Sequence, residues 1–138
     1  MPVDNLKSAL ASVMKGEVSD DAETLKKFSR DTSLFTRMPE LVVYPKDVND
    51  VSELVKVVGA ERERGTEVSV TARAAGTDMS GGPLTTGVVV DFMKHMNNMG
   101  EVTVKDRVLR EDAQDFLTAG FAVTQPGVYY RDFEKATL

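Results

Sequence analysis

The stretch LVVYPKDVNDVSELVKVVGAERERGTEVSVTA, residues 41–72, decides the fold. It begins with an apolar run that Pro45 ends, which predicts a strand over residues 41–44. It ends with a second strand-like run, residues 68–72. The residues between them carry helix signals, and two strands joined by a helix predict a parallel β-α-β unit.

The connecting segment has the pattern of an amphipathic helix. Asp47 is a suitable N-cap, and Gly65 is the expected C-terminal glycine. Arg62 and Arg64 near the end suit the helix dipole. We expect its buried stripe to be Val48, Val51, Leu54, Val55 and Val58.

The flanking residues add further elements around this unit. On the N-terminal side, we expect helices over residues 4–14, capped by Asp4, and 19–29, capped by Ser19. After the unit, residues 87–92 predict a buried third strand.

The C-terminal part has a different pattern. Residues 102–104 and 108–110 flank Lys105-Asp106-Arg107, which predicts a hairpin. Residues 119–124 predict another strand, and residues 129–138 begin a helix.

Together these elements predict an α+β (α/β) fold. A small parallel β-α-β sheet with flanking helices precedes the start of an antiparallel β subdomain. We expect an N-terminal helical segment over 1–40, a first α/β subdomain over 41–98 and an incomplete second subdomain over 99–138.

Composition limits the function. The chain has 138 residues, 41% of them hydrophobic and 28% charged, which is a globular balance. The net charge of −5 argues against a nucleic-acid surface. The sequence has no cysteine, no membrane-span-like apolar run and no signal-peptide core at its start, so we expect a cytoplasmic protein.

The segment TARAAGTDMSGGP, residues 71–83, is the candidate binding loop. Gly76, Gly81 and Gly82 allow close approach to a ligand, and ligands of open α/β sheets bind at the carboxyl ends of strands. A dinucleotide fingerprint would need a helix after its glycines, and a P-loop would need Gly-Lys-Ser/Thr. Neither fits, which leaves a nest of amides for a diphosphate or a plain connecting loop.

Four blocks of the chain carry a family resemblance. They are PELVVYP (39–45), RAAGTDMSG (73–81), VVDFMKHMN (89–97) and QPGV (125–128). In this order they resemble the PCMH-type FAD-binding domain of the FAD-linked oxidase, or vanillyl-alcohol oxidase, superfamily. The glycolate oxidase subunit and D-lactate dehydrogenase branch is the most similar, and the resemblance spans roughly residues 28–138.

The resemblance implies a site for FAD. Backbone amides of residues 74–81 would hold the diphosphate, and the turn at residues 126–128 would approach the same cofactor. Tyr44 and Pro45 would line the adenine side. The implied cofactor-binding residues are Arg73, Ala74, Ala75, Gly76, Thr77, Asp78, Met79, Ser80, Gly81, Gly82, Pro126, Gly127 and Val128.

The chain also departs from the family pattern. Ala74 and Ala75 replace glycines, and Asp78 stands where the family often has serine. Thr77 stands where members with covalent flavin carry histidine, so we expect non-covalent FAD. The family's second glycine-rich block and substrate domain have no counterpart, so we expect a fragment or a stand-alone remnant without turnover of its own.

Several other side chains have simpler explanations than a functional role. His95, the only histidine, is expected to be a surface residue and not a proton carrier. Met79, Met93, Met96 and Met99 are expected to fill the core. Arg73 has two alternatives, a bond to phosphate or a bridge to Asp91.

Three functions therefore stay open. The first is the ADP-binding part of a FAD-dependent 2-hydroxy-acid oxidoreductase. The second is a non-enzymatic nucleotide- or partner-binding domain that has lost FAD. Its apolar surface would be covered in a homodimer or by the rest of the enzyme. The third is the UDP-N-acetylenolpyruvoylglucosamine reductase branch of the same domain type.

Overall fold

The computed structural model describes residues 3–109 and 116–138. Its elements confirm the α+β architecture. In chain order they are α1 (Val3–Val13), β1 (Glu17–Ser19), α2 (Ala22–Phe28), β2 (Leu41–Tyr44), α3 (Val48–Glu63), β3 (Val70–Arg73), β4 (Val88–Asp91), β5 (Thr103–Leu109), β6 (Phe116–Phe121) and α4 (Tyr130–Thr137).

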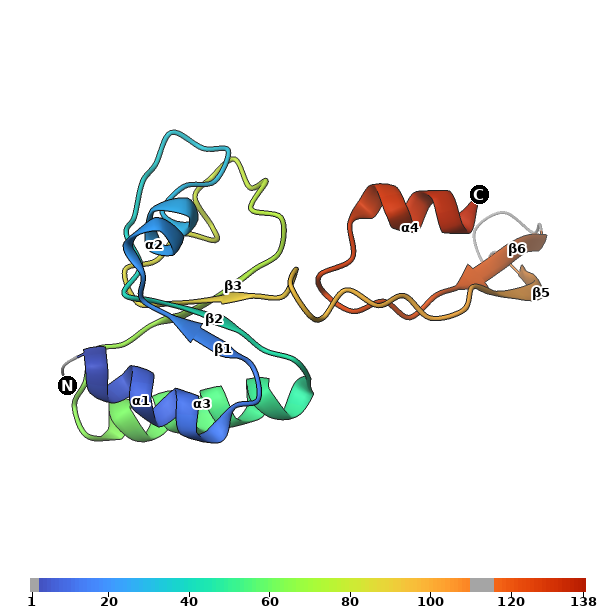
Figure 1. Ribbon diagram of the computed structural model, residues 1–138. Helices are drawn as coiled ribbons and strands as arrows, with labels where there is room; N and C mark the ends of the chain where they lie inside the picture. The colour runs from blue at the N-terminus through green and yellow to red at the C-terminus, as the bar shows by residue number, and fades with distance from the viewer. Residues whose placement is uncertain (1–2, 110–115) are drawn as a thin grey trace.

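The main sheet has the strand order β1-β2-β4-β3 (Figure 1). β2 and β3 are both parallel to β4, as a β-α-β unit requires, but β4 lies between them. All residues of β4 are buried, which suits a central strand covered on both faces. β1 pairs antiparallel with β2 at one edge, so β3 is the other edge strand.

Helices cover the two faces of this sheet unequally. Figure 1 shows α1 and α3 together on one face and α2 on the other. Alternate residues of a strand point to opposite faces, so Val43 packs toward α1 and α3, whereas Val42 packs toward Phe28 of α2. The larger core cluster contains Leu6, Leu10, Met14, Leu41, Val43, Leu54, Val58, Val68, Val88 and Val90.

The helix α3 agrees with the sequence at its ends but not along its whole stripe. Asp47 caps it by accepting the Asp50 amide at 3.0 Å, and Gly65 has φ +87° just after it. Leu54 is buried as expected, but Val48 and Val55 are 73% and 59% exposed, so that part of the prediction was wrong. The apolar stripe that packs on the sheet is therefore narrower than the valine spacing indicated. The larger core cluster contains Leu54 and Val58 of this helix but neither Val48 nor Val55.

The N-terminal helices are shifted from their predicted positions. Residues 17–19 form the edge strand β1, so the second helix begins at Ala22. Asp21, not Ser19, is its N-cap and accepts the Thr24 amide at 2.9 Å. The first helix already includes Val3, so Asp4 lies inside it and does not cap it.

A buried carboxylate joins the segments around β1. Asp50 is 2% exposed and sits in the first turn of α3. Its oxygens accept the backbone amides of Lys15 at 2.8 Å, Gly16 at 2.9 Å and Lys46 at 2.8 Å. One side chain therefore ties the turn after α1 to the turn after β2.

The C-terminal part lies apart from the main sheet in Figure 1. The predicted hairpin turn at residues 105–107 was wrong, because β5 runs through it and pairs antiparallel with β6. The stretch has no glycine or asparagine to form a tight turn, and the strand takes a register shift there instead. The strand expected over 119–124 lies at 116–121, and Arg110 of the predicted hairpin lies outside the described residues.

The end of the chain forms α4, as expected. Among residues 3–109 and 116–138, no helix has the length and apolar character needed to cross a membrane.

Candidate functional site

The candidate site is the loop that follows β3. It leaves the carboxyl end of that strand, where ligands of open α/β sheets bind. A cavity of about 420 Å³ opens beside it. Its lining consists of Ala72, Arg73, Ala74, Ala75, Gly76, Thr77, Asp78, Gly82 and Pro83.

The loop beside this cavity contains a run of free backbone donors. Within the described part of the chain, no hydrogen bond engages the backbone amides of residues 74–79. Gly76 has φ +68°, a conformation that turns successive amides toward one side of a loop. Such a run fits an anionic group, because amide donors bind phosphate without net positive charge.

Other donors of the loop are already used by Asp78. Its Oδ1 atom accepts the Ser80 amide at 2.6 Å, the Ser80 hydroxyl at 2.7 Å and the Gly82 amide at 3.2 Å. The bond from the Ser80 hydroxyl is the main reason that the pKa of Asp78 lies below its usual value. The carboxylate therefore caps the turn, and residues 80 and 82 contribute their amides to the loop itself.

The Arg73 side chain turns toward the segment that follows α2. Its guanidinium donates to the carbonyls of Phe28 at 3.2 Å and Arg30 at 2.7 Å, and it lies 5.2 Å from the centre of the Phe28 ring. The bridge to Asp91 is not formed. Burial is the main reason that the pKa of Arg73 is lowered.

The same segment also reaches the middle of the loop. The Thr32 hydroxyl lies 2.9 Å from the carbonyl oxygen of Thr77 and 2.8 Å from that of Asp78. A Cβ added at Gly81 would lie 3.0 Å from the Phe35 ring. Sequence reasoning missed Thr32, because one threonine in an irregular stretch carries no signal of its long-range contact.

The turn at residues 126–128 lies near the carboxyl end of β4. The Gly127 amide donates to the backbone carbonyl of Met96 at 2.8 Å, and a side chain at Gly127 would overlap the carbonyl of Phe92. The Phe92 amide donates to the backbone carbonyl of Arg73 at 3.1 Å. Gly127 and Val128 line a cavity of about 200 Å³ that is separate from the loop cavity, together with Asn97, Met99, Tyr129 and Asp132.

His95 is partly exposed, in line with the expected surface position, and Met79 differs from expectation. The Nε2 atom of His95 has a specific partner, a Glu17 carboxylate oxygen on β1 at 2.7 Å. Met96 is buried as predicted, but Met79 is 84% exposed. The loop leaves an edge strand, and Met79 belongs to neither core cluster.

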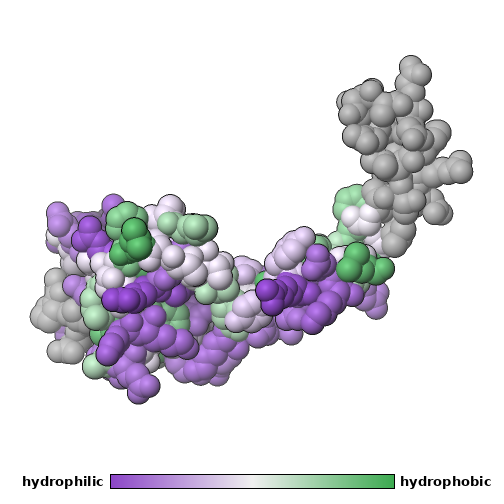
Figure 2. Space-filling view, turned by 90° about the horizontal axis from the view of Figure 1, so that it is seen from above, coloured by the Kyte–Doolittle hydropathy of each residue, from purple (hydrophilic) through white to green (hydrophobic). Residues whose placement is uncertain are grey.

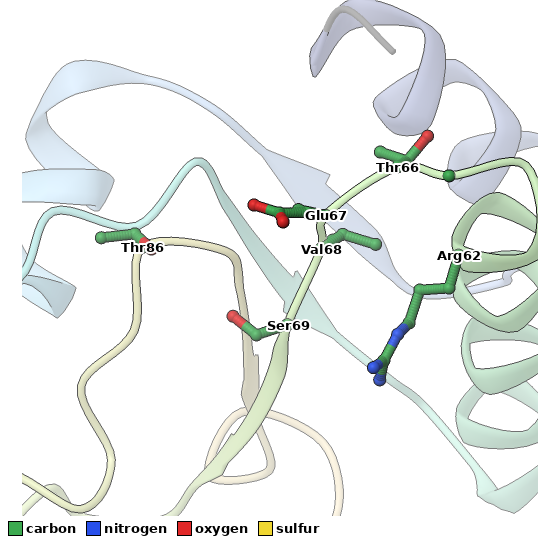
Figure 3. Close-up of a pocket in the computed structure, with 7 residues that line it drawn as sticks. Arg62, Thr66, Glu67, Val68, Ser69 and Thr86 are labelled. Carbon is green, nitrogen blue, oxygen red and sulfur yellow. The ribbon is translucent and has the colours of Figure 1, made fainter.

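Another cavity, of about 510 Å³, lies near the start of β3 (Figure 3). Arg62 extends on one side of residues 66–69, whereas Glu67 and Ser69 point to the other side, toward Thr86. These polar groups do not converge on one point, and the cavity lies at the amino end of the strand. The loop after β3 is therefore the better candidate.

One face of the molecule is largely hydrophilic, with small hydrophobic areas, as Figure 2 shows. Two exposed apolar side chains are Met79, in the loop, and Phe35, whose ring lies beside Gly81.

Comparison with known proteins gives a family and a fold. The family model described as FAD binding domain matches residues 39–137. Among solved structures, the Physcomitrella patens BBE-like 1 variant D396N aligns with a TM-score of 0.54 and 18% identity, covering 72% of this chain and 22% of that chain. At this identity the likeness shows the fold alone.

Curated relatives are much longer than this chain. The D-2-hydroxyglutarate dehydrogenase of Pseudomonas putida is 36% identical over 102 residues, which is 74% of this chain and 10% of that protein. The glycolate oxidase subunit GlcD of Bacillus subtilis is 28% identical over 135 residues, 96% of this chain and 25% of that protein.

Proposed function

The chain belongs to the FAD binding domain family, which matches residues 39–137, and on this premise we propose that the loop over residues 73–82 binds the diphosphate of FAD. The observation that carries the proposal is the run of free amides over residues 74–79 at the carboxyl end of β3. These donors fit a diphosphate, and the adjoining cavity of about 420 Å³ leaves room for it.

We further propose that the chain is the ADP-binding part of a flavin-dependent 2-hydroxy-acid oxidoreductase. The names of two relatives, D-2-hydroxyglutarate dehydrogenase and glycolate oxidase subunit, support this substrate class. Bound flavin supplies the chemistry by accepting a hydride, while these residues bind and orient the cofactor.

The cofactor is held without a covalent bond. Thr77 stands in the loop at the position where covalent members of the family carry histidine. His95, the only histidine of the sequence, is paired with Glu17 on β1. FAD should therefore be released when the protein is denatured, and the released flavin is measured by its fluorescence.

Calorimetric titration with ADP, FAD and FMN tests the proposal. We expect ADP and FAD to bind and FMN to bind weakly, because FMN lacks the AMP part of FAD and carries one phosphate in place of the diphosphate. Ala75→Asp places a carboxylate among the free amides and should weaken ADP binding about fivefold or more. Ala75→Asn is the neutral control, and Ala60→Asp places the same charge on the exposed surface of α3.

The outcomes decide whether the loop binds the ADP half of FAD. ADP binding that Ala75→Asp weakens, and that neither control weakens, supports the site. Absence of binding for both ADP and FAD at millimolar concentration would overturn it, as would equal affinity in all three variants.

A further inference from the structure

The loop over residues 73–82 is attached to the segment over residues 28–37 at two points. Arg73, at the start of the loop, donates to the carbonyls of Phe28 and Arg30. Thr32 contacts the carbonyls of Thr77 and Asp78 in the middle of the loop. The attached residues are more than forty positions apart in sequence, so these contacts are tertiary and not local turn bonds.

The Thr32 contacts determine which way the amides face. In a trans peptide the C=O and the following N–H point in opposite directions. Fixing the carbonyl of Thr77 on Thr32 therefore turns the Asp78 amide away from the segment, and fixing the carbonyl of Asp78 does the same for the Met79 amide. Both amides belong to the run without a hydrogen-bond partner among the described residues.

The Arg73 side chain shapes the first part of the loop. Its guanidinium stacks on Phe28 and lies so close to Gly76 that an added Cβ there would overlap it. Gly76 also has φ +68°, which other residues rarely adopt. The loop thus bends around the guanidinium, and only glycine fits at the bend.

We propose that Thr32 and Arg73 are positioning residues that hold the loop in its ligand-ready shape, with the segment over residues 28–37 as their anchor. The proposal rests on the proposed function, because it takes the ligand to be the diphosphate of FAD. The whole of this segment precedes the stretch matched by the family model, which begins at residue 39. The ligand itself contacts the loop and not Thr32.

Thr32→Val tests the positioning role by removing a hydroxyl while keeping the size of the side chain. One lost hydrogen bond weakens a preorganised site by about three- to tenfold, so we expect the affinity for ADP to fall by that factor. Thr36→Val is the matched control, an exposed threonine in the same segment whose hydroxyl makes no hydrogen bond to the described residues. Thr32→Ser restores the hydroxyl and should restore the affinity.

A second measurement does not depend on the ligand. We expect the backbone ¹⁵N order parameters of residues 74–79, measured by NMR relaxation, to fall in Thr32→Val, with no change in Thr36→Val or in the urea midpoint. A fall confined to the loop supports the positioning role. Unchanged order parameters would overturn it, as would equal ADP affinity in the two valine variants.

The two proposals fail in different ways. If ADP and FAD do not bind the wild-type chain, the proposed function is wrong, and the order parameters still decide whether Thr32 orders the loop. If ADP binds but Thr32→Val binds it equally well, the function stands and the positioning role is wrong.

Discussion

Two carboxylates hold backbone amides in the same way, one inside the protein and one outside. Asp50 is buried and accepts the amides of Lys15, Gly16 and Lys46, whereas Asp78 is exposed and accepts those of Ser80 and Gly82. Water can replace the exposed acceptor but not the buried one. We infer that Asp50 stabilises the fold, while Asp78 shapes a loop that can change with little effect on the fold.

Removing each carboxylate is the strongest test of this comparison. Asp50→Ala leaves three partly buried amides without a partner, so we expect a loss of about 3 kcal/mol or more in the free energy of unfolding. Asp78→Ala should leave the urea midpoint nearly unchanged. Similar shifts in the two midpoints would contradict the comparison.

A smaller effect is expected from the glycine beside each carboxylate. The Gly16 amide donates to Asp50, and a Cβ at Gly16 would overlap the carbonyl oxygen of Tyr44, so Gly16→Ala should lose about 1–3 kcal/mol of stability. A Cβ at Gly82 would lie 3.2 Å from the carboxylate end of Asp78. That side chain is free to move, so we expect Gly82→Ala to unfold at the wild-type urea concentration.

The comparison also shows which features of the structure can be predicted from the sequence. Local patterns predicted β2, α3 and β4, since an apolar run or a capped amphipathic stretch is visible within a few residues. The role of Asp50 was not predicted, because two of its three partners lie more than thirty positions away. Thr32 was missed for the same reason.

The candidate site was predictable in its place but not in its detail. The glycines marked the loop over residues 73–82, and the strand before it indicated which edge of the sheet it would occupy. Side-chain direction was not visible in the sequence, so Arg73 had two alternatives, a bond to phosphate or a bridge to Asp91. In the structure it contacts two backbone carbonyls and not Asp91, and the bond to phosphate stays a prediction. The exposure of Met79 depends on the same tertiary detail.

The charge of Asp78 allows a sharper test within the loop. Asp78→Asn keeps the acceptor that caps the turn and removes a negative charge beside the proposed diphosphate. A unit charge at about 4 Å in water is worth about 1 kcal/mol, so we expect ADP to bind up to about fivefold more tightly at low salt. Asp21→Asn is the control, because it removes the charge of an exposed aspartate that caps α2 and not this turn. Unchanged affinity would mean that the Asp78 carboxylate faces away from the ligand.

The smallest expected effect is the pH dependence of the loop. The bond from the Ser80 hydroxyl holds the pKa of Asp78 below its usual value, so the cap is fully present above the ordinary aspartate pKa and is lost as pH falls through the lowered one. Asp21 provides an internal standard, because hydrogen bonds, first that of the Ser19 hydroxyl, lower its pKa to about 2. In an NMR titration, the Thr24 amide should report a midpoint near 2, and the Ser80 and Gly82 amides a midpoint below the ordinary aspartate pKa. Asp78→Asn should remove the loop transition and leave that of Thr24, whereas a loop midpoint at the ordinary aspartate value would show that the exposed cap is too weak to order these amides.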